Sequence, residues 1–290
     1  MSDAVPFFTI ITATYNAAAT LPRLLESLAG QTYRGFELII QDGASTDGTV
    51  AAAESHRDRL PSLSLASEPD NGIYDAWNKA LTRMRGEWAL FLGADDELAD
   101  TAALATARKK VKLVMPDIVF AAASLQKINP NGTIRNVLRP EKLTAAMSSL
   151  RQGYMPVPHP ALLHRRSLFT SDYRFDASFA IAGDDDFLCR TWTPEKTAIL
   201  NMVLTRMHDG GVSVNPFFAL AKRKEVLRIV RKYYPQNVSF ALHILPVLKG
   251  YPLQAICKIF GKKYAPGVLD ALRTLRGLPP VWTRYGKDKP

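Results

Sequence analysis

Short apolar runs that alternate with helical patterns are the feature that most constrains how this chain can fold. Four such runs, each short enough for a buried β-strand, span residues 7–13, 36–41, 63–66 and 88–92. Residues 20–28 and 74–84 show the three- and four-residue spacing of apolar positions that is typical of helices. Strands that alternate with helices in this way predict βαβ units, a mostly parallel central sheet and therefore an α/β fold.

The polar residues that follow these runs are predicted to meet at one edge of the sheet. Thr14, Asp42, Ser67 and Asp95 stand at or just past the ends of the four strands. The carboxyl ends of parallel strands share an edge, and ligands of open α/β sheets bind there. We therefore expect one crevice whose side chains together could hold a base, a ribose and a diphosphate with its metal. Its expected residues are Tyr15, Asp42, Asp70, Lys79, Asp95 and Asp96.

The adjacent carboxylates of Asp95 and Asp96 suggest a cation at this edge. Neighbouring carboxylates repel each other unless a cation or protonation relieves them. Mg²⁺ is usually held by one or two carboxylates, with substrate phosphates and waters completing its shell. An acidic first turn of a helix is the alternative interpretation. We predict a divalent metal site, with the choice between Mn²⁺ and Mg²⁺ left open.

A second acidic cluster, Asp184, Asp185 and Asp186, opens an apolar helical stretch. Helical residues advance by about 100° each, so at most one or two of these carboxylates can face the crevice. Asp184 could cap the helix or act as a general base. We expect Asp185 on a solvated face and Asp186 beside an arginine.

The middle of the chain departs from the regular alternation. Residues 102–111 are expected to form a helix, residues 117–121 a strand and residues 129–132 a hairpin turn. His159 stands between Pro158 and Pro160, whose rings fix the direction of the backbone. It is a candidate for contact with an acceptor, with a structural role as the alternative.

Charge is divided unevenly between the two parts of the chain. Residues 1–204 hold 21 lysines and arginines against 23 acidic residues, whereas residues 205–290 hold 16 against 4. A basic tail suggests an anionic partner: a membrane surface, a phosphate-bearing substrate or nucleic acid. Residues 219–234 predict a basic amphipathic helix, which would contact a membrane interface or simply pack with a cationic solvent face.

The compartment is predicted from what the sequence contains and lacks. The first residues have no pattern of a signal peptide, and we expect no apolar run as long as a membrane span. Two cysteines, Cys189 and Cys257, fit a reducing compartment as packing residues. We expect a cytoplasmic protein whose basic tail could place it peripherally at the inner face of the cell membrane.

Four ordered motifs resemble glycosyltransferase family 2, and its bacterial members that build surface polysaccharides most closely. The motifs span residues 9–16, 41–49, 67–80 and 93–97, and the acidic motif around Asp184 follows them. The resemblance covers roughly residues 7–213. It implies a catalytic domain over residues 1–213, with a GT-A fold built on a Rossmann-like sheet, and a basic helical extension over residues 214–290.

The resemblance implies an inverting glycosyltransferase. Such an enzyme moves a sugar from a nucleotide-sugar donor, expected to be a UDP-sugar, to a hydroxyl of a saccharide or lipid-linked saccharide in polysaccharide biosynthesis. Donor-binding residues carried over from the family are Thr14 and Tyr15 at the base, Asp42 at the uracil-type ring, and Asp70 and Lys79 near the ribose and phosphates. Asn16 and Asp95 are also expected to bind the donor.

The resemblance also assigns the metal ligand and the general base. Asp95 and Asp96 match the acidic metal motif, in which the second carboxylate is the usual ligand. The family's base motif is commonly Glu-Asp, with an arginine six positions after the aspartate. Arg190 is six positions after Asp184, so Asp184 is the expected base. Gly183 replaces the usual glutamate, which leaves Asp185 as the alternative.

Two other classes of protein compete with this interpretation. A sugar nucleotidyltransferase is also α/β and metal-using, but it usually has a Gly-rich loop with a basic residue near its N-terminus, where this chain has residues 14–17. A nucleic-acid-binding protein could use the basic tail, although no recognisable DNA-binding motif supports it and no nucleic acid is expected. The sugar, the acceptor and the oligomeric state stay open.

Overall fold

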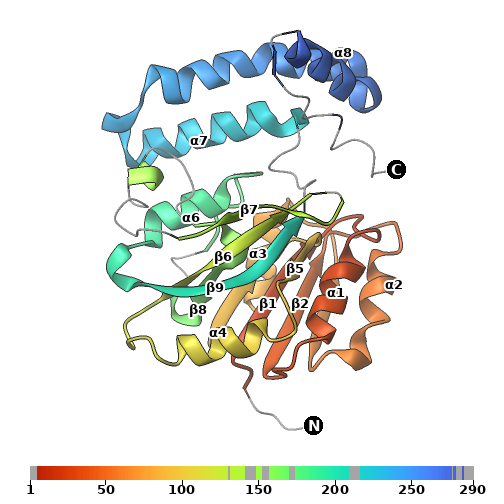
Figure 1. Cartoon of the computed structure of the whole chain (residues 1–290), viewed down its shortest axis with the longest axis vertical. Helices are drawn as coiled ribbons and strands as arrows, with labels where there is room; N and C mark the ends of the chain where they lie inside the picture. The colour runs from red at the N-terminus through yellow and green to blue at the C-terminus, as the bar shows by residue number, and fades with distance from the viewer. Residues whose placement is uncertain are drawn as a thin grey trace. The chain divides into compact units, whose positions relative to one another are not determined.

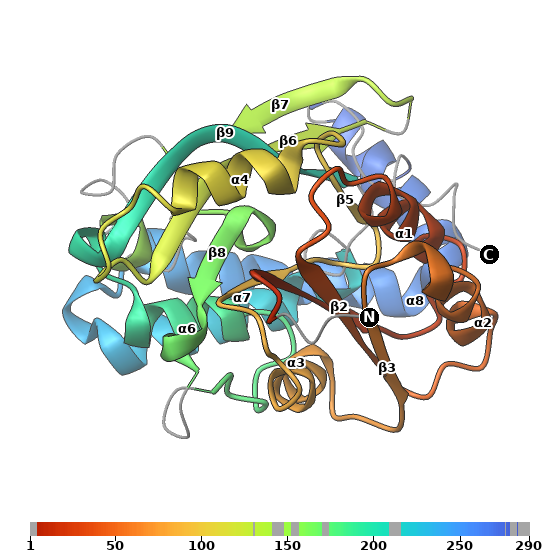
Figure 2. The same ribbon diagram turned by 90° about the horizontal axis from the view of Figure 1, so that it is seen from below.

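The computed structural model describes residues 5–129, 131–140, 148–151, 157–169, 174–208, 216–275, 277–278 and 283. The chain forms two compact units. The first consists of Met1–Leu150 with Tyr154–His208, and the second of Arg151–Gly153 with Asp209–Pro290. A β-sheet organises the first unit, and the second is helical (Figures 1 and 2).

The described strands form one sheet in the order β3-β2-β1-β4-β8-β6-β9-β5, with β7 paired to β6. Its N-terminal part is parallel, as predicted: β2 and β4 flank β1, and β3 pairs with β2. These strands are β1 (Phe8–Thr14), β2 (Phe36–Asp42), β3 (Leu63–Ser67) and β4 (Trp88–Phe91). Their carboxyl ends therefore share the edge that the sequence analysis assigned to the crevice.

The later strands add antiparallel pairs, so the sheet as a whole is mixed. They are β5 (Asp96–Leu98), β6 (Phe120–Ile128), β7 (Ile134–Leu138), β8 (Leu162–Arg165) and β9 (Thr197–His208). β8 runs antiparallel to β4 and β6, whereas β6 and β9 are parallel. The predicted hairpin connects β6 to β7, with Asn129 N–H bonded to the carbonyl of Thr133 at 2.9 Å. The strand expected over residues 117–121 begins only at Phe120, because exposed turn residues precede it.

Helices cover both faces of the sheet. One face packs against α1 (Leu21–Ala29), α2 (Thr49–Glu54) and α4 (Ala103–Val111), which share a core with alternate residues of the parallel strands. The other face carries α3 (Ile73–Leu81) and α6 (Gly183–Thr191) over a cluster of aromatic rings. Short helical turns are η1 (Arg57–Arg59), η2 (His159–Ala161), η3 (Arg166–Leu168) and η4 (Pro194–Lys196).

The second unit contains two longer helices. They are α7 (Ala219–Tyr233) and α8 (Leu245–Thr274), accompanied by η6 (Pro216–Phe218), η7 (Pro235–Asn237) and the π-helical turn η8 (Phe240–Ile244). Gly261 interrupts α8 with φ 63° and ψ 179°, a conformation that glycine adopts without steric cost. The predicted basic helix is thus present as α7.

Among the described residues, one helical segment is long and apolar enough to cross a membrane by length and composition alone. Phe240–Gly261 has 22 residues, and its most apolar window of 18 residues has a mean hydropathy of 1.2 and is 17% buried. This corrects the expectation that no run reaches the length of a span. Lys249 and Lys258 interrupt the run in the sequence, but the apolar residues around them outweigh their contribution to the mean hydropathy.

Candidate active site

Asp42 ties together the ends of the first three strands. Its Oδ1 accepts hydrogen bonds from Thr14 Oγ1 at 2.7 Å and Ser45 Oγ at 2.5 Å, and its Oδ2 accepts from Ser45 N–H at 2.8 Å and Ser67 Oγ at 2.7 Å. Burial would raise the pKa of Asp42, but the hydrogen bonds from Ser45, Ser67 and Thr14 outweigh it and lower that pKa. All four acceptor sites of the Asp42 carboxylate are therefore occupied by protein donors, and these hydrogen bonds hold the edge of the sheet together. Direct contact of Asp42 with a nucleotide base stays a prediction.

The loop after β1 is bonded to the loop after β2. Asn16 has φ 48°, donates its N–H to Ser45 Oγ at 2.8 Å, and accepts the N–H of Thr46 at 3.0 Å. Tyr15, between Thr14 and Asn16, is 69% exposed. A fixed loop therefore presents an exposed aromatic ring at the carboxyl edge, where a nucleotide base could stack on it.

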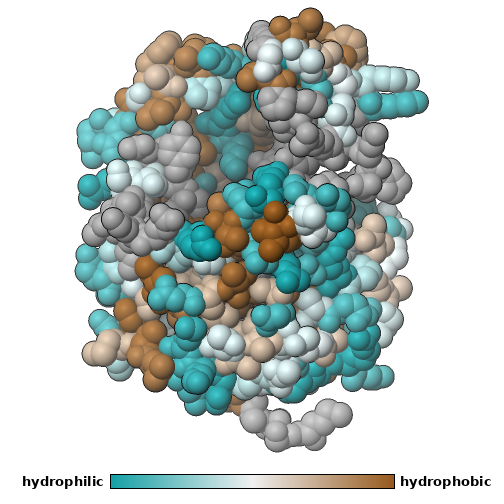
Figure 3. Space-filling model, viewed as in Figure 1, coloured by the Kyte–Doolittle hydropathy of each residue, from teal (hydrophilic) through white to brown (hydrophobic). Residues whose placement is uncertain are grey.

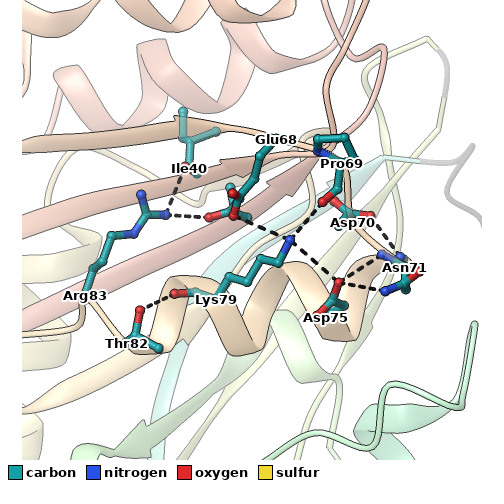
Figure 4. A network of polar contacts seen from close by, with 11 residues as sticks. Ile40, Glu68, Pro69, Asp70, Asn71, Asp75, Lys79, Thr82 and Arg83 are labelled. Atoms are coloured by element: carbon teal, nitrogen blue, oxygen red, sulfur yellow. Dashed lines mark hydrogen bonds and ion pairs between the residues drawn. The ribbon is translucent and has the colours of Figure 1, made fainter.

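Asp70 lies in the neighbouring loop between β3 and α3, and Lys79 lies on α3 and reaches back to that loop. Asp70 Oδ1 accepts the N–H of Gly72 at 2.8 Å, and a Cβ built on Gly43 would lie 2.7 Å from Asp70 Oδ2. Gly43 thus leaves room for Asp70 beside Asp42. Lys79 Nζ donates to the carbonyl of Pro69 at 2.8 Å and lies 3.4 Å from Glu68 Oε1 (Figure 4).

Lys79 therefore holds the loop in which Asp70 lies. Its ammonium group also lies 3.8 Å from Asp75 Oδ2, on the same helix. Glu68 and Asp75 are partners that the sequence analysis did not assign. The spacing of Asp75 and Lys79, four residues apart on a helix, was the available signal for one of them.

Asp95 and Asp96 lie close together at the start of β5. A Cβ on Gly93 would lie 2.8 Å from Asp95 Oδ1 and 3.2 Å from Asp96 Oδ2, so both carboxylates approach the same glycine. Asp96 is buried, and its Oδ2 accepts the N–H of Gly93 at 2.7 Å. Burial, together with the charge of Asp95, raises the pKa of Asp96 well above its ordinary value.

The residues present at this position fit a divalent cation. Asp96 Oδ1 is buried and has no hydrogen-bond partner among the described residues. A cation would supply that partner and relieve the repulsion between the two carboxylates. No cluster of three or more histidine, cysteine or acidic side chains occurs in the part of the chain that the structure describes. The pair therefore suits a metal that takes its other ligands from a substrate.

Asp184, the expected base, lies in the first turn of α6 and is bonded to α3. The hydroxyl of Tyr74 is 2.9 Å from Asp184 Oδ1 and 2.7 Å from the carbonyl oxygen of Ile181. Because α3 follows β3, its first turn lies at the carboxyl edge of the sheet, and Tyr74 brings Asp184 to that edge. Of the two carboxylate oxygens of Asp184, only Oδ1 has a hydrogen-bond partner among the described residues.

Tyr74 is a site residue that the sequence analysis did not assign. Burial and the neighbouring Asp184 raise the pKa of Tyr74 well above its ordinary value, so the hydroxyl keeps its proton and donates it. A Cβ on Gly183 would lie 2.7 to 2.9 Å from atoms of the Tyr74 ring. The ring therefore leaves no room at position 183 for the glutamate that the resemblance leads one to expect there.

The two carboxylates after Asp184 have different environments. Asp186 is fully buried and accepts a hydrogen bond from Arg190 Nε at 3.0 Å, which confirms the expected ion pair. Asp185 is only 7% exposed, so the expectation of a solvated face is wrong. The first turns of α6 are enclosed on several sides, since Asp185, Asp186, Phe187 and Leu188 are all buried in succession.

His159 lies in the aromatic cluster beneath the start of α6. Its ring stacks on Trp77 at 5.2 Å with an interplanar angle of 11°, and it lies 4.8 Å from the ring of His164. Burial lowers the pKa of His159 to about 4, although the charge of Asp184 acts in the opposite direction. The buried ring packs against Trp77 of α3, which favours a structural role for His159 over contact with an acceptor.

The sheet, its polar carboxyl edge and the carboxylate at the start of α6 define a GT-A transferase that acts on a nucleotide-linked sugar. The model of the family "Glycosyl transferase family 2" matches residues 9–169, more than half of the chain. A PGL/p-HBAD biosynthesis glycosyltransferase of Mycobacterium bovis is 30% identical over 255 residues, which cover 84% of this chain and 90% of the relative. The chain belongs to glycosyltransferase family 2.

Solved structures share this fold. TarS residues 1–349 of Staphylococcus aureus, solved with UDP-GlcNAc, gives a TM-score of 0.61 at 19% identity and covers 85% of this chain and 72% of that one. The mannosyltransferase PcManGT of Pyrobaculum calidifontis, solved with GDP-Man and Mn²⁺, gives 0.59 at 19% identity and covers 98% and 84%. At this identity the likeness shows the fold.

Proposed function

We propose that this glycosyltransferase moves a sugar from a UDP-sugar to a hydroxyl of a saccharide or lipid-linked saccharide, with inversion at the anomeric carbon. The observation that carries the proposal is the Tyr74–Asp184 hydrogen bond, because it brings the later acidic motif to the sheet edge where Asp95 and Asp96 lie. The UDP-GlcNAc in the TarS structure supports the choice of nucleotide.

The proposed reaction needs a base on the acceptor side of the sugar. The acceptor oxygen forms a bond to the anomeric carbon, and the bond from that carbon to the diphosphate oxygen breaks. Asp184 takes the acceptor proton on Oδ2, while Tyr74 holds Oδ1 and fixes the carboxylate's orientation. Asp185 is the less suitable base because it is more deeply buried.

The leaving nucleotide would be held at the other strand ends. Tyr15 offers an exposed ring for the base, and the loops at the strand ends that carry Asp42 and Asp70 would enclose the rest of the nucleoside. Asp96 and Asp95 would hold Mn²⁺ or Mg²⁺, which when bound stabilises negative charge on a leaving diphosphate. The Mn²⁺ in the PcManGT structure supports a divalent metal.

Thermal denaturation with nucleoside diphosphates, each with and without Mn²⁺, tests this function. We expect UDP with Mn²⁺ to raise the Tm most, because a ligand at a hundred times its Kd adds about 2.7 kcal/mol to the free energy of unfolding. The Asp96→Ala variant should lose the metal-dependent part of the shift. A Tm shift with GDP instead of UDP would show that the donor is a GDP-sugar. No Tm shift with any nucleotide would refute the proposal.

A product assay distinguishes the competing enzyme class. Incubation with a UDP-sugar panel and saccharide acceptors should release UDP. If the protein instead forms a UDP-sugar from a sugar 1-phosphate and UTP, it is a nucleotidyltransferase and the proposed transfer is wrong.

A further inference from the structure

Helix α8 carries an exposed apolar stripe before its kink. Leu248, Tyr251, Ala255 and Ile259 are separated by three, four and four residues, the spacing of one helix face. Leu248 is 50%, Tyr251 51% and Ile259 75% exposed. Figure 3 shows hydrophobic residues at the surface over α8. We call these four residues the α8 stripe.

The opposite face of α8 packs within the helical unit. A Cβ on Gly250 would lie 2.8 Å from a methyl carbon of Leu220 on α7, so the two helices approach closely there. Cys257 is 1% exposed and forms a small core with Ala265 and Leu269. The α8 stripe therefore lies on the other side of the helix from this packing. At Tyr251 helix α7 reaches the stripe, since Lys224 Nζ lies 4.9 Å from the centre of the Tyr251 ring.

Positive charges border the α8 stripe on both sides. Lys249 follows Leu248 by one residue and Lys258 precedes Ile259 by one, so each lies about 100° from the stripe, in opposite directions around the helix. Both lysines are exposed. Residues 216–275 hold eleven lysines and arginines against two acidic residues, so the whole unit attracts anionic surfaces.

We infer that the α8 stripe docks this protein on an anionic lipid surface, with the helix lying in the plane of the interface. An apolar stripe between cations matches such a surface, because the apolar side chains enter the acyl boundary while lysines meet the headgroups. Helix α7 offers no such stripe, since its exposed residues include Lys224, Arg228, Arg231 and Lys232.

The charges also argue against a helix that crosses the bilayer. A span over Phe240–Gly261 would place Lys249 and Lys258 in or near the hydrocarbon core, where charged side chains are costly. In the plane of the interface both can remain hydrated. This inference goes beyond the proposed function, because docking requires neither nucleotide nor metal.

Co-sedimentation of the full chain with vesicles, without nucleotide, tests the inference. We expect binding to vesicles with 30% phosphatidylglycerol and weaker binding to phosphatidylcholine alone. Leu248→Gln/Ile259→Gln should lower the partition coefficient at least tenfold. Leu113→Gln/Ile134→Gln, which replaces exposed apolar residues of the catalytic unit, should leave it unchanged.

The two lysines are expected to provide the charge-dependent part of vesicle binding. Lys249→Gln/Lys258→Gln should lower the partition coefficient for the anionic vesicles several-fold, toward the value for the neutral vesicles. The control Lys109→Gln/Lys112→Gln should leave it unchanged. Equal binding by wild type and stripe variant would overturn the inference. So would resistance of bound protein to carbonate extraction, which indicates a span, or concentration-dependent self-association through the stripe without vesicle binding.

Discussion

Single residues set the chemistry at the start of α6. Tyr74 has one hydroxyl proton and two acceptors within reach, Asp184 Oδ1 and the carbonyl of Ile181. When Asp184 is ionised, the hydroxyl can donate to it. When Asp184 has taken a proton on Oδ2, its Oδ1 is a carbonyl oxygen that can still accept the hydrogen bond from the hydroxyl. The pair can therefore remain hydrogen-bonded in both states.

Asp184→Asn should abolish transfer while nucleotide binding persists. An amide retains the size of the carboxylate but cannot take up the acceptor proton. Turnover and UDP affinity, measured on the same preparation, check this outcome. Equal loss of both would show that Asp184 does not act only as the base.

Tyr74→Phe should lower kcat about tenfold and leave nucleotide affinity within about twofold. Hydrogen bonds to charged groups contribute about 1.5 to 3 kcal/mol, and 1.4 kcal/mol corresponds to a factor of ten. The phenyl ring keeps the packing against Gly183, so any drop in Tm should come from the lost hydrogen bond and not from the ring. Tyr74 is thus a positioning residue, and an unchanged kcat would contradict that role.

At the scale of elements, the contact between α3 and α6 depends on a glycine. Gly183→Ala should cost about 1 to 3 kcal/mol in the free energy of unfolding, because its Cβ would meet the Tyr74 ring at 2.7 to 2.9 Å. A drop of several degrees in Tm should follow. Gly48→Ala is the matched control, since its Cβ would make an ordinary contact of 3.6 Å with Ala18.

Removing the Tyr74 ring tests the origin of this loss of stability. In the Tyr74→Leu background, Gly183→Ala should cost less than in the wild type, because the clashing ring is absent. If the cost is the same in both backgrounds, the clash with Tyr74 is not its origin.

At the scale of the whole molecule, the buried histidines tie stability to pH. Burial lowers the pKa of His159 from 6.5 to about 4, and burial with the neighbouring His159 lowers that of His164 well below 6.5. The unfolded chain therefore binds more protons than the folded one between these values. Stability should fall as the pH falls from about 6.5 toward 4.

The expected slope is about 1.4 kcal/mol per pH unit for each histidine that titrates. Denaturant melts across this range should show it, and His159→Phe, which keeps an aromatic ring beside Trp77, should make the slope shallower. A wild-type slope equal to that of His159→Phe would contradict this account.

The parallel half of the sheet and its polar edge could be predicted from the order of the residues alone. Apolar runs identify buried strands, and parallel connection brings their ends together, so the places of Thr14, Asp42 and Asp95 followed from local pattern. The same holds for Asp186 and Arg190, whose spacing of four residues makes them neighbours on any helix.

Which side chains are enclosed and which are exposed depends on how the elements pack. Four features depend on residues remote in sequence or on the packing of whole elements. They are the burial of Asp185, the four hydrogen bonds to the carboxylate of Asp42, the contacts of Lys79 with the loop before its helix, and the exposed α8 stripe. Tyr74 and Asp184 are separated by 110 positions, yet one hydrogen bond joins them. Periodicity shows which face of an element is apolar, but packing decides what covers that face.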